Sequence, residues 1–132
     1  MRLFRNSWFR KFARKQRISD AALCEAIVRI EAGLVDADLG GGLLKQRVAR
    51  EGHGRSGGYR TLIAFKTDTR AVFVFGFAKS EQANIDAEDE RELKKLAALV
   101  LSFAEEEMDQ LVAAGKFDEV KCDGEGSEDV PE

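Results

Sequence analysis

The feature that most constrains the fold is an apolar run over residues 71–78, in which Gly76 is the one interruption. A run of this length is too short to span a membrane, which takes about 20 residues. It is typical of a β-strand that is covered on both faces. A second strand is expected over residues 59–66, joined to the first by a turn at residues 67–70. The apolar run is therefore expected to be a central strand.

A third strand is expected over residues 43–49. A glycine-rich, basic loop over residues 50–58 would connect it to the next strand as a hairpin. Side-chain alternation places Lys45 and Arg47 on one face of the third strand and its apolar side chains on the other. Three consecutive strands with short connections predict an antiparallel meander.

The N-terminal part of the chain predicts a short strand and two helices that would cover one face of this sheet. Residues 2–5 form the strand, and a helix that begins at residue 6 or 7 carries Trp8 and Phe12 on one face. Lysines and arginines fill the rest of this helix. They fit either a phosphate-contacting surface or a solvated face above an aromatic core stripe. The second helix is expected over residues 19–32.

A C-terminal amphipathic helix is expected over residues 88–108, because leucine, valine and alanine recur there at helical spacing. Three consecutive glutamates from Glu105 would then lie at its C-terminal end, where their charges oppose the helix dipole. Residues 121–132 are acidic and poor in apolar side chains, which is typical of disorder. The chain therefore divides into a folded domain, residues 1–112, and an acidic, largely flexible extension, residues 113–132.

Charge is distributed very unevenly along the chain. Residues 1–80 hold 16 Lys+Arg against 7 Asp+Glu, and residues 81–132 hold 5 against 17, so balances of +9 and −12 give the net charge of −3. Such asymmetry suggests a basic working surface and an acidic tail. The acidic segment from Glu105 onward could fold over the basic surface and weaken its binding, or it could be solvated and aid solubility.

The residue types disfavour several kinds of site. His53 is the one histidine, so no histidine cluster can bind a metal within one chain. The glycine clusters lack the P-loop pattern, and no G-x-S-x-G motif marks a nucleophilic serine. Cys24 and Cys122 form no C-x-x-C motif and are expected to be reduced thiols in the cytoplasm. No metal, cofactor, secretory signal or membrane segment is expected.

What remains is a set of cations that the predicted strands would bring together: Lys45, Arg47, Arg50, Arg55, Arg60 and Lys79. A basic patch on a sheet can bind a polyanion. It can also cleave RNA without a metal, because RNA supplies its own nucleophile, the 2′-OH. Arginine would stabilise charge on the phosphorane, and a lysine, Tyr59 or His53 would exchange protons. Basic sheets also occur in RNA-binding proteins that are not catalytic.

Three segments carry a family resemblance: GGGLLKQRVAR over residues 40–50, GGYR over residues 57–60 and GFAKSE over residues 76–81. In this order they resemble the RelE/HigB-like toxins of type II toxin–antitoxin systems, most closely a phage-derived branch. The resemblance covers about residues 2–112. It implies a RelE-like α+β fold, in which N-terminal helices pack on a small antiparallel sheet, with a C-terminal helix and an acidic tail.

The resemblance also implies an activity and partners. These toxins are metal-independent endoribonucleases that usually cut mRNA in the ribosomal A site and inhibit translation. Each is neutralised by an antitoxin, often a helix-turn-helix protein. The basic positions of the family correspond to the candidate catalytic residues Lys45, Arg47, Arg60 and Lys79. The candidate RNA-binding residues are Arg50, His53, Arg55 and Tyr59.

Two positions depart from the RelE pattern. Ser80 stands where RelE has an arginine that stabilises phosphate, and Asp86 stands where it has a tyrosine that stacks or exchanges protons. The departures leave two other functions open. One is a ParE-like toxin that acts on DNA gyrase without cutting RNA, and the other is a plain nucleic-acid-binding or assembly protein of prophage origin.

Overall fold

The computed structural model describes residues 1–50 and 54–122, with the backbone alone at residues 50 and 54–57. It contains one mixed sheet with the strand order β2-β3-β4-β5-β1-β6. The strands are β1 (Arg2–Asn6), β2 (Ala37–Gly40), β3 (Leu43–Arg50), β4 (Gly54–Lys66), β5 (Arg70–Ala78) and β6 (Phe117–Val120). The helices are α1 (Ser7–Gln16), α2 (Asp20–Glu31), α3 (Ala87–Ser102) and α4 (Glu105–Ala113). The expected α+β fold class is confirmed.

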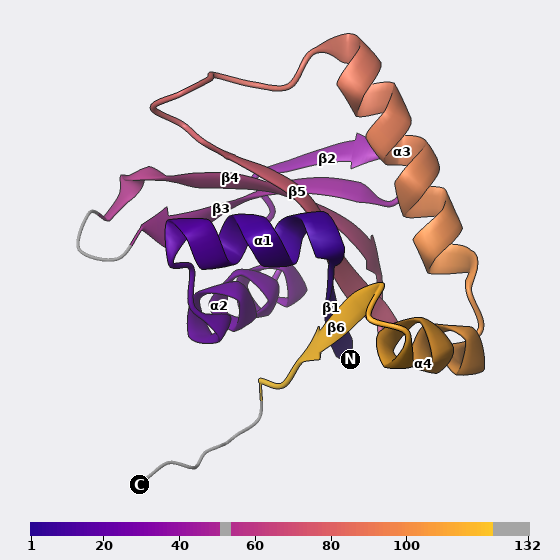
Figure 1. Cartoon of the computed structure of the whole chain (residues 1–132). Coiled ribbons are helices and arrows are strands. Elements are labelled where there is room, and N and C mark those ends of the chain that lie inside the picture. Colours follow the sequence, from indigo (N-terminus) through magenta and orange to yellow (C-terminus); the bar gives the residue numbers. More distant parts are fainter. Residues whose placement is uncertain (51–53, 123–132) are drawn as a thin grey trace, which may run out of the picture.

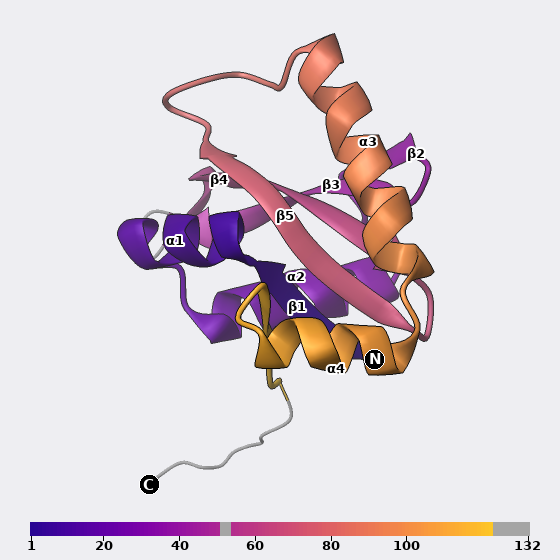
Figure 2. The ribbon, with the colours of Figure 1, turned by 45° about the vertical axis from the view of Figure 1, so that its right-hand side comes forward.

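Strand β5 is central, as the apolar run predicts. It pairs with β4 on one side in antiparallel fashion and with β1 on the other side in parallel fashion. Every residue of β5 except Phe75 is buried. Helices α1 and α2 cover one face of the sheet, and α3 and α4 lie on the other (Figures 1 and 2). The antiparallel meander β3-β4-β5 is confirmed.

A β-bulge in β5 shifts the alternation of its side chains between the two helical layers. Leu62 of β4 pairs with Phe75, and the next residue, Ile63, pairs with Phe73, so Val74 is an extra residue in β5. Beyond the bulge, Gly76 faces α1, and a Cβ atom there would lie 2.8 Å from the Phe12 ring. Only glycine lets the helix approach β5 so closely at this point.

The N-terminal helices begin where their capping residues predict. Asn6 Oδ1 accepts a hydrogen bond from the backbone N–H of Phe9 at 2.8 Å, and Ser19 Oγ accepts one from Ala22 at 3.1 Å. Each cap satisfies a backbone donor that the first helical turn leaves without a partner. The expected start of α1 and both expected ends of α2 are confirmed within a residue.

The expected single C-terminal helix is wrong. The chain leaves α3 at Ser102, passes through Phe103 and Ala104 in extended conformation, and begins α4 at Glu105. The three glutamates therefore lie in a first helical turn, where negative charge stabilises the helix instead of opposing its dipole. The Glu107 carboxylate also accepts a hydrogen bond from the N–H of Ala104 at 2.7 Å.

A sixth strand follows α4 inside the segment assigned to the acidic extension. Strand β6 pairs in antiparallel fashion with β1, and Phe117 and Val120 are buried in the two cores. The expectation of disorder for residues 121–132 falls mostly on residues 123–132, which lie outside the described residues. In the part of the chain that the structure describes, no helix has the length and hydropathy needed to cross a membrane.

Arginines of the N-terminal half bind acids of the C-terminal half. Arg2 donates hydrogen bonds to Glu119, Glu105 and Asp109 at 2.8–2.9 Å. Arg70 is 2% exposed and donates to the Glu105 carboxylate at 2.9 Å and to the backbone oxygen of Val100 at 2.8 Å. Glu105 and its described neighbours thus neutralise arginines of β1 and β5. The expectation that the acidic segment covers the basic patch is wrong for this part of it.

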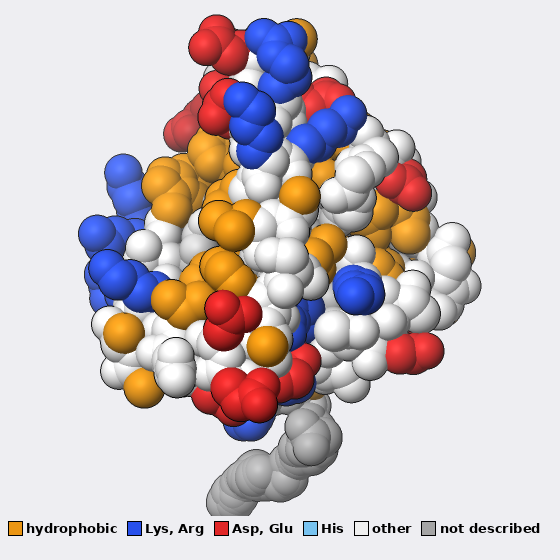
Figure 3. Space-filling view, turned by 90° about the vertical axis from the view of Figure 1, so that its right-hand side faces the viewer, with side chains coloured by type: hydrophobic (Ala, Val, Ile, Leu, Met, Phe, Trp, Pro, Cys, Tyr) orange, Lys and Arg blue, Asp and Glu red, His pale blue; other side chains and the backbone are white. Residues whose placement is uncertain are grey.

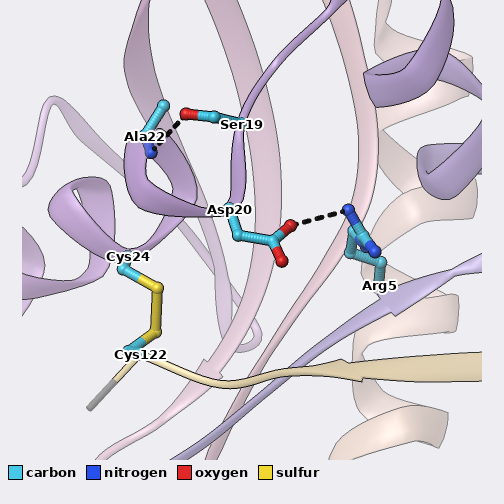
Figure 4. The surroundings of a disulfide bond; sticks show 6 residues. All are labelled: Arg5, Ser19, Asp20, Ala22, Cys24 and Cys122. Carbon is cyan, nitrogen blue, oxygen red and sulfur yellow. Dashed lines mark hydrogen bonds and ion pairs between the residues drawn. A yellow bond between two sulfur atoms is a disulfide. The ribbon is translucent and has the colours of Figure 1, made fainter. Parts of the chain in front are cut away.

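The two cysteines form a disulfide, contrary to the expected pair of reduced thiols. Cys24 of α2 and Cys122, two residues beyond β6, have Cα atoms 5.6 Å apart (Figure 4). Strand β6 carries Cys122 past α2, so residues separated by 98 positions meet. Next to the bond, Arg5 of β1 forms an ion pair with Asp20 at the start of α2.

Reduction of the disulfide is expected to lower the free energy of unfolding. A crosslink across 98 residues restricts the unfolded chain and stabilises the fold by up to about 4 kcal/mol. Urea unfolding of the oxidised and reduced chain would measure the difference, and Cys24→Ser without reductant should match the reduced chain. Equal unfolding midpoints together with two titratable thiols in the absence of reductant would contradict the disulfide.

Acid is expected to destabilise the contact between β1, β6 and α4. Hydrogen bonds from Arg2 and Arg70 lower the pKa values of Glu119 and Glu105. Because these pKa values are lower in the folded state, the stabilisation is complete above pH ~4.5 and is lost as the pH falls below it. Glu119→Gln should cost roughly 1–2 kcal/mol at pH 7 and flatten the acid limb of a stability-against-pH curve, whereas the exposed Glu88→Gln should do neither.

Candidate functional site

Three cations lie together on the face of the sheet that carries α3. Lys45 and Arg47 alternate with the side chains of β3 that pack against α1 and α2, so they share the face of buried Leu43. The Cα atom of Arg47 pairs with that of Arg60 in β4, and that of Lys45 pairs with Leu62. Of the six cations expected to converge, the strand register brings these three together.

Helix α3 packs over the start of β3 and leaves the three cations further along the sheet uncovered. Its Lys94 and Leu101 lie beside Gly40, Gly41 and Gly42, just before β3 begins. Arg47 lies four residues further along β3, and all three cations are partly exposed to solvent. The part of the face nearest the hairpin between β3 and β4 is therefore accessible to a ligand.

Arg60 occupies an electrostatically unfavourable position. Burial and the positive charge of Arg47 lower its pKa, and the negative charge of Asp36 opposes that shift in part. Its Nη1 atom is buried and has no hydrogen-bond acceptor among the described residues. A guanidinium remains charged under all physiological conditions. An anion bound at this position would reduce the repulsion between the two arginines and could complete their hydrogen bonding.

The loop between β5 and α3 borders the same site. Lys45 Nζ donates to Asn84 Oδ1 at 3.2 Å, and that oxygen also accepts from the backbone N–H of Ile85 at 2.9 Å. Lys79 is exposed and directly follows β5, where its N–H donates to the backbone oxygen of Gly58 at 3.4 Å. Lys79 thus lies at the beginning of the loop, with β4 between β5 and the strand that carries Lys45 and Arg47.

Asp36 is a neighbour of the cations that the sequence analysis missed. Its carboxylate accepts a hydrogen bond from the backbone N–H of Arg47 at 2.6 Å. Buried Gln46 fixes this segment, because its side chain accepts from the N–H of Asp36 and donates to the backbone oxygen of Leu34, both at 2.9 Å. No motif marks Asp36. It is placed by β2, a strand that the sequence analysis also missed.

The remaining candidate residues fall into two groups. Tyr59 is 2% exposed on the opposite face, where its hydroxyl donates to Gln16 Oε1 at 3.2 Å. The structure therefore does not bring Tyr59 to the cations. His53 lies outside the described residues, as do the side chains of Arg50 and Arg55, so their part in the site stays a prediction.

The two positions that depart from the RelE pattern lie in the loop between β5 and α3. Ser80 is exposed, directly after Lys79. Asp86 is the N-cap of α3 and accepts a hydrogen bond from the backbone N–H of Asp89 at 2.8 Å. A carboxylate suits this position because it satisfies the first turn of the helix. Asp86 thus has a structural role in this chain.

The arrangement can bind a phosphodiester and stabilise charge that develops on it. Arg47 and Arg60 present fixed positive charge, and Lys45 and Lys79 add two mobile ammonium groups. The Asp36 carboxylate is the one acidic group that the described contacts place at these cations. Among residues 1–50 and 54–122, no group of three or more His, Cys, Asp or Glu side chains is arranged to hold a metal ion.

Comparison with known protein families agrees with this geometry. The family model described as "RelE toxin of RelE / RelB toxin-antitoxin system" matches residues 1–120, which extends from β1 to the end of β6. No curated protein matches the chain. Because the family model spans every strand and helix of the sheet and its two layers, the chain belongs to the RelE toxin family.

Proposed function

We propose that this toxin is a metal-independent endoribonuclease that cuts mRNA on the ribosome and so inhibits translation. The observation that carries the proposal is the pairing of Arg47 with Arg60 beside Lys45 on an uncovered face of the sheet. Two arginines directly opposite each other destabilise a sheet unless an anion binds between them. A phosphate of RNA is an anion of the right geometry for arginine.

The proposed reaction uses the 2′-OH of the RNA as nucleophile. The 2′-oxygen attacks the adjacent phosphorus, the bond to the 5′-oxygen breaks, and the products are a 2′,3′-cyclic phosphate and a free 5′-OH. Arg47 and Arg60 stabilise the extra charge of the phosphorane. Asp36 can accept the proton from the 2′-OH, and a protonated Lys45 or Lys79 can donate one to the leaving 5′-oxygen.

The family also supports a protein partner. The RelE/RelB description includes an antitoxin, and we propose that it is a helix-turn-helix protein that neutralises this chain in the cytoplasm. We also propose that the chain belongs to the phage-derived, HigB-like branch of the family, and the segments of residues 40–50, 57–60 and 76–81 support this.

One observation favours a second candidate function. Asp86 caps α3 at the position where RelE has its tyrosine, and Ser80 supplies no charge. A site without those two groups could bind nucleic acid or DNA gyrase without cutting RNA. Growth arrest with intact mRNA and an induced DNA-damage response would support this ParE-like function over the first.

The rate of mRNA cleavage is expected to depend on the paired arginines. Arg60→Ala should lower the rate of mRNA cleavage on translating ribosomes by about 100-fold, because one charge-stabilising group is lost from the transition state. Arg91→Ala, at an exposed arginine of α3 that forms no ion pair among the described residues, is the matched control and should cut normally. Mapping of mRNA 5′ ends measures both.

Two results would contradict the proposal. One is the absence of new, codon-phased 5′ ends with the unaltered chain. The other is cleavage that Arg60→Ala and Arg47→Ala leave unchanged, since the reaction would then lie elsewhere.

A further inference from the structure

A groove lies beside the first helix, on the other side of β5 from the paired arginines. It has a volume of about 390 Å³ and runs between α1, the second half of β5 and the start of the following loop. Trp8, Phe12, Phe75 and Phe77 contribute its aromatic lining, and Lys11 and Lys15 contribute its positive charge. None of these residues belongs to the site described above.

The aromatic rings of the groove are already stacked on one another. The centroid of the Trp8 ring lies 4.5 Å from that of Phe75 at an interplanar angle of 27°, and 5.3 Å from that of Phe12 at 17°. Trp8 is nevertheless 43% exposed. A large, fixed aromatic surface that stays in contact with water is typical of a binding site.

The backbone builds this aromatic cluster by two separate means. The bulge at Val74 changes the phase of β5 before Phe75, which is only partly buried. Gly76, the next residue, has no Cβ atom to displace the Phe12 ring. Phe12 and Phe75 therefore both reach Trp8, and the three rings form one surface.

The positive charges of the two groove lysines are accessible to a ligand. Lys11 and Lys15 are exposed, one helical turn apart, and neither forms an ion pair among the described residues. By contrast, Arg2, Arg5 and Arg10 all bind carboxylates of the C-terminal half. Only Glu81 adds negative charge to the lining. The groove therefore offers two cations at the edge of an aromatic surface.

We propose that this groove binds bases of single-stranded RNA next to the cleavage site, with stacking on the Trp8–Phe75 cluster and phosphates at Lys11 and Lys15. Stacked aromatics bordered by lysines are the combination that binds single-stranded nucleic acid without strong sequence preference. The inference rests on the proposed function, because it extends the same RNA beyond the scissile phosphate.

The groove borders the strand next to the one that carries Arg60 of the proposed cleavage site. Phe77 lines the groove, and its Cα atom pairs with that of Arg60 across β4 and β5. Lys79 follows two residues later, and Gln82 of the same loop lines the groove again. In the proposal, an RNA strand that leaves Arg60 along this loop reaches the aromatic cluster.

The sole tryptophan of the chain provides a direct probe. The full chain is titrated with a six-nucleotide 2′-O-methyl RNA, which cannot be cut because the nucleophile is blocked. Quenching of Trp8 fluorescence is expected, since a base stacks at its ring. An oligonucleotide with abasic sites and equal charge should bind about tenfold more weakly and leave the emission unchanged.

Variants separate stacking from charge. Lys11→Gln with Lys15→Gln should weaken binding about tenfold near 0.1 M salt and lower the salt slope by about 1.4, or about 0.7 per phosphate contact. Lys66→Gln with Lys116→Gln, two exposed lysines without ion pairs among the described residues, is the matched control and should change neither. Trp8→Leu, followed by anisotropy of a labelled oligonucleotide, should weaken binding to a similar degree while its melting temperature confirms the fold.

Three outcomes would overturn the inference. They are unchanged Trp8 emission on binding, equal binding of the abasic oligonucleotide, and equal quenching and competition by an acidic peptide, which would make the groove a protein-binding surface. The proposed function fails separately. If the groove variants bind RNA normally and the unaltered chain still cuts ribosomal mRNA, only the proposed role of the groove is wrong. If the groove variants bind RNA more weakly and the unaltered chain leaves mRNA intact, only the proposed cleavage activity is wrong.

Discussion

The two-sided burial of β5 is the constraint on which the other elements depend. A strand with apolar side chains on both faces needs two layers, and α1 with α2 supplies one while α3 with α4 supplies the other. The second layer is incomplete. Helix α3 crosses the sheet at the start of β3 and does not extend to the other end of this strand (Figure 2). The paired arginines lie beyond the helix, so the candidate site is on the part of this sheet face that α3 and α4 do not cover.

The arrangement of charge follows from the same sheet. Strand β6 lies against β1, which brings the acids of the C-terminal half to arginines of the N-terminal half. Figure 3 shows acidic side chains gathered around α4, at the lower end of the face in view. Part of the uneven charge of the sequence is therefore neutralised by ion pairs between the two halves of the chain. Several described cations form no ion pair, among them Arg47 and Arg60 on the sheet and Lys11 and Lys15 along α1.

Sequence patterns predicted the elements whose apolar content is high, and they failed where it is low. Strand β5, the meander and both N-terminal helices follow from apolar periodicity and capping residues. Strand β6 has two buried residues in four and carries no such signal. The break between α3 and α4 is hidden because apolar residues continue through it, from Val100 to Met108. Alternation placed Lys45 and Arg47 correctly, but Asp36, the role of Gln46 and the disulfide depend on tertiary contacts that no local pattern encodes.

The position of β1 in the sheet has a consequence for synthesis. Strand β1 precedes the other described elements, yet its neighbours are β5 and β6, which leave the ribosome 68 and more than 100 residues later (Arg2 pairs with Arg70, and Leu3 with Val120). Such non-local pairing makes folding slow, because long loops must close before contacts form. The nascent chain therefore carries β1 without its sheet neighbours until β5 and β6 have been made. The basic site can complete its supporting sheet only after the last strand has emerged.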